Sequence, residues 1–144
     1  MNHTGIGKWN IGVGLWLMAG FMVYGFVLIY LRDFAPDKLA WIEGYNVSPH
    51  FEARLAHVHG NLFSFLNIVF GFLLLRLLIK PGLARWASWL ALAGLLMPLG
   101  ILGEVYLGIP FYLVLVGGLS ILAATIALGV GVVQMRLTPE GRRS

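Results

Sequence analysis

Three ionisable side chains, those of His57, His59 and Glu104, lie within or at the ends of long apolar stretches of this sequence. Placing such groups at membrane depth costs free energy, so those that occur there usually bind ions, protons or ligands. Imidazole nitrogen is a common metal ligand, and a carboxyl group can hold or release a proton. These three side chains are therefore the first candidates for chemistry.

The two histidines face different directions if the segment around them is a regular helix. At about 100° per residue, Arg54, His57, Asn61 and Ser64 share one face, whereas His59 points about 160° away. The face of His57 is small and polar, and the residues that follow His59 are bulky and apolar. We therefore expect His57 to be the ligand and His59 to be structural.

The available ligands restrict which metal centres are possible. The chain has no cysteine, which excludes disulfides, cysteine-ligated zinc, iron–sulfur clusters and thioether-attached haem. Its four histidines are His3, His50, His57 and His59. Because no other apolar stretch contains a histidine, a haem held between two helices would need a second subunit. A haem with one axial histidine remains possible, and Arg54 or Arg32 could pair with its propionates.

Glu104 and Tyr106 come at the end of the third apolar stretch. An up-down topology would place them at the same membrane level as His57. Convergence of polar groups from separate helices is typical of a binding site. A carboxyl group there could stay neutral, pair with an arginine, or donate a hydrogen bond to a bound substrate.

Composition and charge placement predict one membrane-embedded domain. Of 144 residues, 59% are hydrophobic and 11% are charged, and the mean hydropathy is +0.85. Stretches without Asp, Glu, Lys or Arg run over 9–31, 55–75, 86–103 and 105–135, each long enough to cross about 30 Å of hydrocarbon. We predict an all-α membrane protein, a four-helix up-down bundle over 1–144, with spans of approximately 9–31, 52–78, 84–106 and 110–135 and an outer loop over 32–51.

The net charge of +4 is explained by membrane topology and not by nucleic-acid binding, because the basic residues flank apolar stretches. One side of the bundle would carry Lys8, Arg76, Lys80, Arg85, Arg136, Arg142 and Arg143, and the other Arg32, Lys38 and Arg54. The positive-inside rule then predicts a multi-pass protein of a bacterial-type inner or plasma membrane, with both termini cytoplasmic. The length of the first apolar stretch argues against a cleaved signal peptide.

Several residues predict how the helices begin, bend and pack. Ser48 and Pro49 are a suitable cap and first-turn pair for the second span, and Pro98 should kink the third. Glycines allow close helix approach, and they occur in the first and fourth spans as Gly12, Gly14, Gly20, Gly25, Gly117, Gly118, Gly129 and Gly131.

The run His57-Val58-His59-Gly60-Asn61-Leu62-Phe63-Ser64 resembles the H-x-H-x-N-L-x-[G/S] pattern of small membrane proteins related to the haem-copper oxidase and nitric oxide reductase superfamily. Together with Arg54-Leu55-Ala56 and the four spans, it also resembles styrene oxide isomerase, a small membrane haem b enzyme that rearranges an aryl epoxide to an aldehyde. The resemblance implies a trimer in which His57 ligates haem b and the open iron face acts as a Lewis acid. Tyr106 is the candidate for the isomerase's helix-three tyrosine.

The sequence thus leaves three functions open: an isomerase of small hydrophobic epoxides, a non-enzymatic haem protein for gas binding or electron transfer, and a cofactor-free membrane subunit or transport module. We expect a homo-oligomer in the lipid bilayer with a small hydrophobic ligand. The candidate residues are Asn61, Glu104 and Tyr106 for catalysis, and Arg32, Arg54, His57 and Ser64 for cofactor binding, with His57 as the metal ligand.

Overall fold

The computed structural model describes residues 5–47 and 49–135, and within these ranges the chain is helical with no strand. The described residues form six helices: α1 (Lys8–Asp33), α2 (Lys38–Glu43), α3 (His50–Arg76), α4 (Pro81–Gly94), α5 (Leu96–Leu107) and α6 (Tyr112–Val133). Four segments are long and apolar enough to cross a membrane, namely Lys8–Asp33, His50–Arg76, Pro81–Leu107 and Tyr112–Val133. The predicted all-α four-helix bundle is therefore confirmed.

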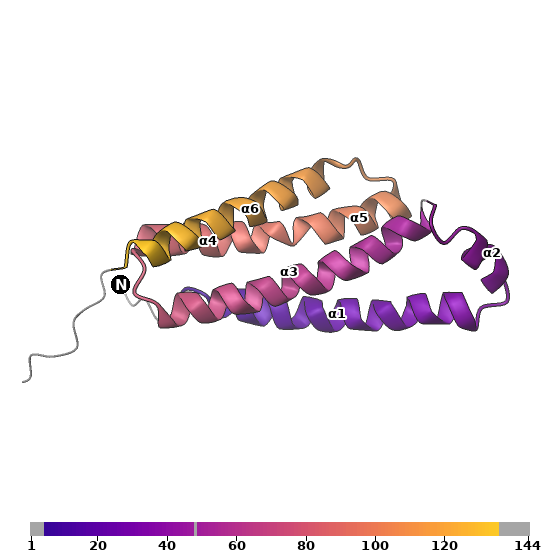
Figure 1. Cartoon of the computed structure of the whole chain (residues 1–144), viewed down its shortest axis with the longest axis horizontal. Coiled ribbons are helices and arrows are strands. Elements are labelled where there is room, and N and C mark those ends of the chain that lie inside the picture. The colour runs from indigo at the N-terminus through magenta and orange to yellow at the C-terminus, as the bar shows by residue number, and fades with distance from the viewer. Residues whose placement is uncertain (1–4, 48, 136–144) are drawn as a thin grey trace, which may run out of the picture.

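The bundle consists of two helical hairpins (Figure 1). In one hairpin α1 packs along α3, and in the other α6 packs along α4 and α5. Contacts of α3 with α4 and α5 join the hairpins. The short helix α2 lies at the end where α1 finishes and α3 begins. The predicted outer loop over 32–51 thus contains a helix that sequence periodicity did not reveal.

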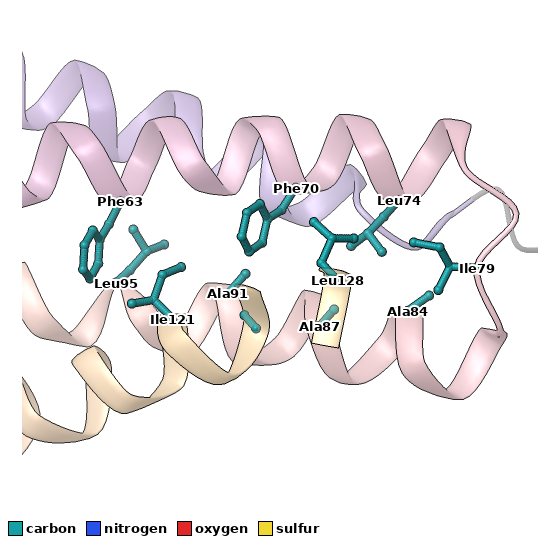
Figure 2. Close-up of a cluster of buried hydrophobic side chains, with 11 residues drawn as sticks. Phe63, Phe70, Leu74, Ile79, Ala84, Ala87, Ala91, Leu95, Ile121 and Leu128 are labelled. Carbon is teal, nitrogen blue, oxygen red and sulfur yellow. The ribbon is translucent and has the colours of Figure 1, made fainter. Parts of the chain in front are cut away.

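The main apolar core lies between α3 and the second hairpin. Figure 2 shows Phe63, Phe70 and Leu74 of α3 directed toward α4 and α6. The facing residues of α4 are small, Ala84, Ala87 and Ala91, whereas α6 contributes the larger Ile121 and Leu128. Small residues facing large ones let the helices approach closely while the space between them stays filled.

The third span is broken, as Pro98 predicts. Helix α4 ends at Gly94 and α5 begins at Leu96. In a regular helix, the residue at position 98 would donate its N–H to the carbonyl of Gly94, four residues earlier. Proline has no N–H, so this hydrogen bond is missing. The second span begins at His50, and the predicted capping residue Ser48 lies outside the described residues.

Only some of the glycines lie at close helix contacts. A Cβ atom on Gly14 would lie 2.7 Å from the carbonyl oxygen of Ser64, and one on Gly117 would overlap the backbone of Met97. In contrast, a Cβ on Gly12, Gly20 or Gly129 would meet nothing within 4 Å. Within one copy of the chain, therefore, only some of these glycines mark close approach, because glycine content does not indicate which side of a helix is packed.

Large apolar side chains cover the outer faces of the first and last helices. Trp16 and Phe26 on α1 are 81% and 70% exposed, and Val133 on α6 is 85% exposed. Exposed apolar surface of this extent is costly in water and favourable in hydrocarbon. The outer faces of both hairpins are therefore suited to contact lipid.

Candidate functional site

His57 lies about two turns from the start of α3 and packs directly against α1. Its Nδ1 is 2.8 Å from the carbonyl oxygen of Phe21. The approach requires Gly25, since a Cβ atom there would lie 2.5 Å from Cε1 of the imidazole. A carbonyl oxygen can only accept a hydrogen bond, so Nδ1 carries the proton. In the neutral imidazole the other ring nitrogen, Nε2, then keeps its lone pair, and it makes no hydrogen bond among the described residues.

Asn61 lies one turn further along α3, beside His57. Its Nδ2 donates to the backbone carbonyl of His57 at 2.9 Å. The same amide nitrogen is 3.4 Å from Nδ1 of His57. Because Nδ1 already donates to Phe21, the longer approach is a contact and not a second hydrogen bond. Asn61 is therefore bonded to its own helix, with its carbonyl oxygen free of hydrogen bonds among the described residues.

A groove of about 550 Å³ runs along the outer side of the α1–α3 pair. Its size lies within the usual range of small-molecule sites, about 300–1,000 Å³. The walls are mostly apolar, and α2 and the segment after it close one end. The lining residues are Met22, Gly25, Phe26, Leu28, Ile29, Arg32, Trp41, Tyr45, Arg54, His57, Val58 and Asn61.

The two arginines of the groove differ in their partners. Arg54 donates from Nη2 to the backbone carbonyl of Tyr45 at 2.7 Å, and its guanidinium carbon lies 3.4 Å from the centre of the Tyr45 ring. Its Nε is buried without a hydrogen-bond partner among the described residues. Arg32 instead forms an exposed ion pair with Asp33 at 2.8 Å. Arg54 has no such carboxylate partner within the described ranges, so it supplies positive charge to the groove.

The structure brings together four of the seven candidate residues, since Arg32, Arg54, His57 and Asn61 all line the groove. Ser64 does not reach it. Its side chain is fully buried against α1, where Gly14 allows close approach, and its Oγ has no hydrogen-bond partner among the described residues.

Glu104 and Tyr106 also lie away from the groove. Glu104 is exposed near the end of α5. The Tyr106 hydroxyl lies 2.9 Å from that of Tyr24, and its side chain lines a separate cavity. The reason is the position of α5, which packs against α3 but is not one of the elements that line the groove.

His59 contacts residues of its own helix. Its Nδ1 lies 3.0 Å from the carbonyl oxygen of Leu55 in the same helix. Its ring meets Phe63 edge-on, with ring centres 5.9 Å apart. The sequence reasoning did miss Trp41 and Tyr45, which belong to the predicted outer loop. Their aromatic type was a signal, because aromatic residues are enriched in ligand sites.

The residues that line the groove are compatible with haem bound through a single histidine. No three His, Cys, Asp or Glu side chains gather to hold a bare metal ion within 5–47 and 49–135. A histidine that ligates a metal commonly donates its other ring N–H to a carbonyl, as His57 does to Phe21. Apolar walls suit a macrocycle, and an arginine without a carboxylate partner suits an acidic substituent.

Comparisons with protein families, with curated proteins and with solved structures found no match to this chain. The site is therefore interpreted from its own residues.

Proposed function

We propose that this membrane protein binds haem b in the groove between α1 and α3, with His57 as the axial ligand. The observation that carries the proposal is the 2.8 Å contact from Nδ1 of His57 to the carbonyl of Phe21. In the neutral imidazole, which is the form that binds metals, this hydrogen bond leaves Nε2 unprotonated. The same ring lines a groove with two arginines at hand.

Each part of the groove has a distinct task in this proposal. His57 would bind iron through Nε2, and Met22, Phe26 and Val58, which line the groove, would provide apolar contact for the macrocycle. Arg54 would pair with a propionate, and Tyr45 holds the guanidinium in place through its ring face and its backbone carbonyl. Arg32 would be the second propionate partner, in exchange for its exposed ion pair with Asp33. The bound group would supply a Lewis-acidic iron for a small ligand or a substrate oxygen.

The surroundings of the groove favour assembly in a bilayer. The groove opens on the outer side of the α1–α3 pair, where Phe26 and Val58 are mostly exposed. A homo-oligomer, a trimer by the resemblance to styrene oxide isomerase, would cover this side with a second copy. With both termini in the cytoplasm, the groove would lie near the outer boundary of a bacterial-type inner or plasma membrane.

Isomerisation of a small hydrophobic epoxide is the activity that the resemblance adds to haem binding. Of the three residues expected to act on the substrate, Asn61 lines the groove, and its Oδ1 and remaining N–H are available to position a polar group. Tyr106 and Glu104 lie elsewhere, so the proposal assigns them no contact with substrate. Gas binding by the same iron remains the non-enzymatic form of the proposal.

The test is reconstitution in mild detergent. Wild-type protein titrated with haemin should develop a saturable Soret band. The band should be lost in His57→Ala and kept in His59→Ala, a matched change two residues away on the same helix. Added imidazole should restore it in His57→Gly, because the free base can occupy the vacated space.

Two results would contradict haem binding through His57: a haemin spectrum with wild-type protein that equals the spectrum in empty micelles, or a His57→Ala variant that binds haemin as well as the wild type. The first result would favour a cofactor-free membrane subunit. Conversion of styrene oxide by the reconstituted protein, compared with Asn61→Ala, tests the isomerase separately.

A further inference from the structure

A second cavity lies where α1, α2, α3 and α5 meet. Its volume is about 280 Å³, larger than the cavity of about 150 Å³ that can hold benzene in an engineered apolar core. Only Leu28 and Trp41 line both this cavity and the groove. None of the proposed haem-binding residues lines it. It is therefore a separate space with its own chemistry.

The walls of the second cavity are aromatic and apolar. Trp41 stacks on the imidazole of His50 with ring centres 4.9 Å apart and planes 19° apart. Tyr106 closes the side toward α5, and Leu31 and Ala53 provide aliphatic surface. A flat aromatic molecule gains apolar burial and offset stacking against such walls.

Two polar groups of the cavity have unused hydrogen-bonding capacity. His50 makes no hydrogen bond among the described residues, and because its Nδ1 is buried against Gly44, Nε2 is the ring nitrogen left for a ligand. The Tyr106 hydroxyl bonds only to that of Tyr24 and can make a further hydrogen bond. A ligand that forms a hydrogen bond with one of these side chains adds that bond to its apolar burial.

The cavity has no charged wall. Its lining residues are Leu28, Leu31, Trp41, Pro49, His50, Ala53, Val105 and Tyr106, and none of them has a permanently charged side chain. A charged ligand would lose its hydration without gaining a counter-charge. We propose that this cavity binds a small neutral aromatic molecule with one hydrogen-bonding group, of the phenol type.

The proposal is tested with two probes of similar size, 4-fluorophenol and 4-fluorotoluene. The first carries a hydroxyl group where the second carries a methyl group. Binding to haem-free protein in micelles is measured by ¹⁹F NMR, with empty micelles subtracted. Ala53→Leu fills the cavity and should lower the affinity for both probes at least about fivefold. Met22→Leu changes only the groove and should leave both affinities within about twofold.

His50→Phe and Tyr106→Phe keep a ring in the wall and remove one polar group each. At least one of them should lower the affinity for 4-fluorophenol about five- to tenfold, which corresponds to the loss of one hydrogen bond. The same variant should leave the affinity for 4-fluorotoluene within about twofold of the wild type. Thermal unfolding and elution volume verify that each variant is folded.

The proposal is overturned if Ala53→Leu leaves both affinities unchanged, or if Met22→Leu lowers them as much as Ala53→Leu does. It is also overturned if both polar variants retain the wild-type affinity for 4-fluorophenol. Because no haem is present, these outcomes do not depend on whether His57 binds iron.

Discussion

Asn10 of α1 and Asn67 of α3 are hydrogen-bonded to each other inside the bundle, with Nδ2 of Asn10 3.0 Å from Oδ1 of Asn67. Both side chains are fully buried. Asn10 also donates to the backbone carbonyl of Ser88 at 2.9 Å and accepts from its hydroxyl, and Asn67 donates to the carbonyl of Ala91 at 2.8 Å. One polar network thus joins α1, α3 and α4.

Removing one member of this network should destabilise the bundle, because its partners stay buried without hydrogen bonds. We expect Asn67→Ala to lower the free energy of unfolding by about 1–3 kcal/mol. Asn61→Ala is the matched control, since Asn61 bonds only within its own helix, and it should cost less than about 0.5 kcal/mol. Equilibrium unfolding in mixed micelles measures both, and equal losses would disprove a special role for the network.

The close contact of His57 with Gly25 should make haem binding sensitive to a single methyl group. Gly25→Ala places Cβ 2.5 Å from Cε1 of His57 and must displace the imidazole. We expect the dissociation constant for haemin to rise at least about tenfold. Gly20→Ala in the same helix meets nothing within 4 Å and should bind haemin like the wild type. If both variants bind equally well, the position of the ring does not control ligation.

Arg54 should contribute to haem affinity through its charge. Arg54→Gln removes the positive charge beside Tyr45 and should weaken haemin binding about tenfold, whereas Arg54→Lys should be intermediate, because lysine keeps the charge but not the planar fork. Arg85→Gln, at the opposite end of the bundle, is the control. Titration of the Soret band gives each dissociation constant. An unchanged value in Arg54→Gln would remove this arginine from the site.

The membrane orientation can be tested by cysteine labelling, because the chain contains no cysteine of its own. Lys38→Cys lies on α2, and Lys80→Cys lies between α3 and α4, at opposite ends of the bundle. With both termini in the cytoplasm, an impermeant maleimide should label Lys38→Cys in intact cells, and Lys80→Cys only after permeabilisation. The reverse pattern would invert the topology.

The sequence alone predicted the spans, because long uncharged runs between charged residues have one stable arrangement in a membrane. The predicted first span over 9–31 corresponds to Lys8–Asp33, and the break before Pro98 follows from its missing N–H. Helical periodicity also placed Arg54, His57 and Asn61 on one face of α3, and all three line the groove.

Tertiary structure decided which of these residues share a site. Ser64 continues the face of His57, yet α1 crosses close to α3 at Gly14 and buries it. Tyr106 was predicted at the same membrane level as His57. Because α5 does not border the groove, Tyr106 lines the second cavity instead. Periodicity describes one helix at a time. The direction in which a neighbouring helix approaches depends on side-chain packing between distant segments, and that packing determines which polar groups meet.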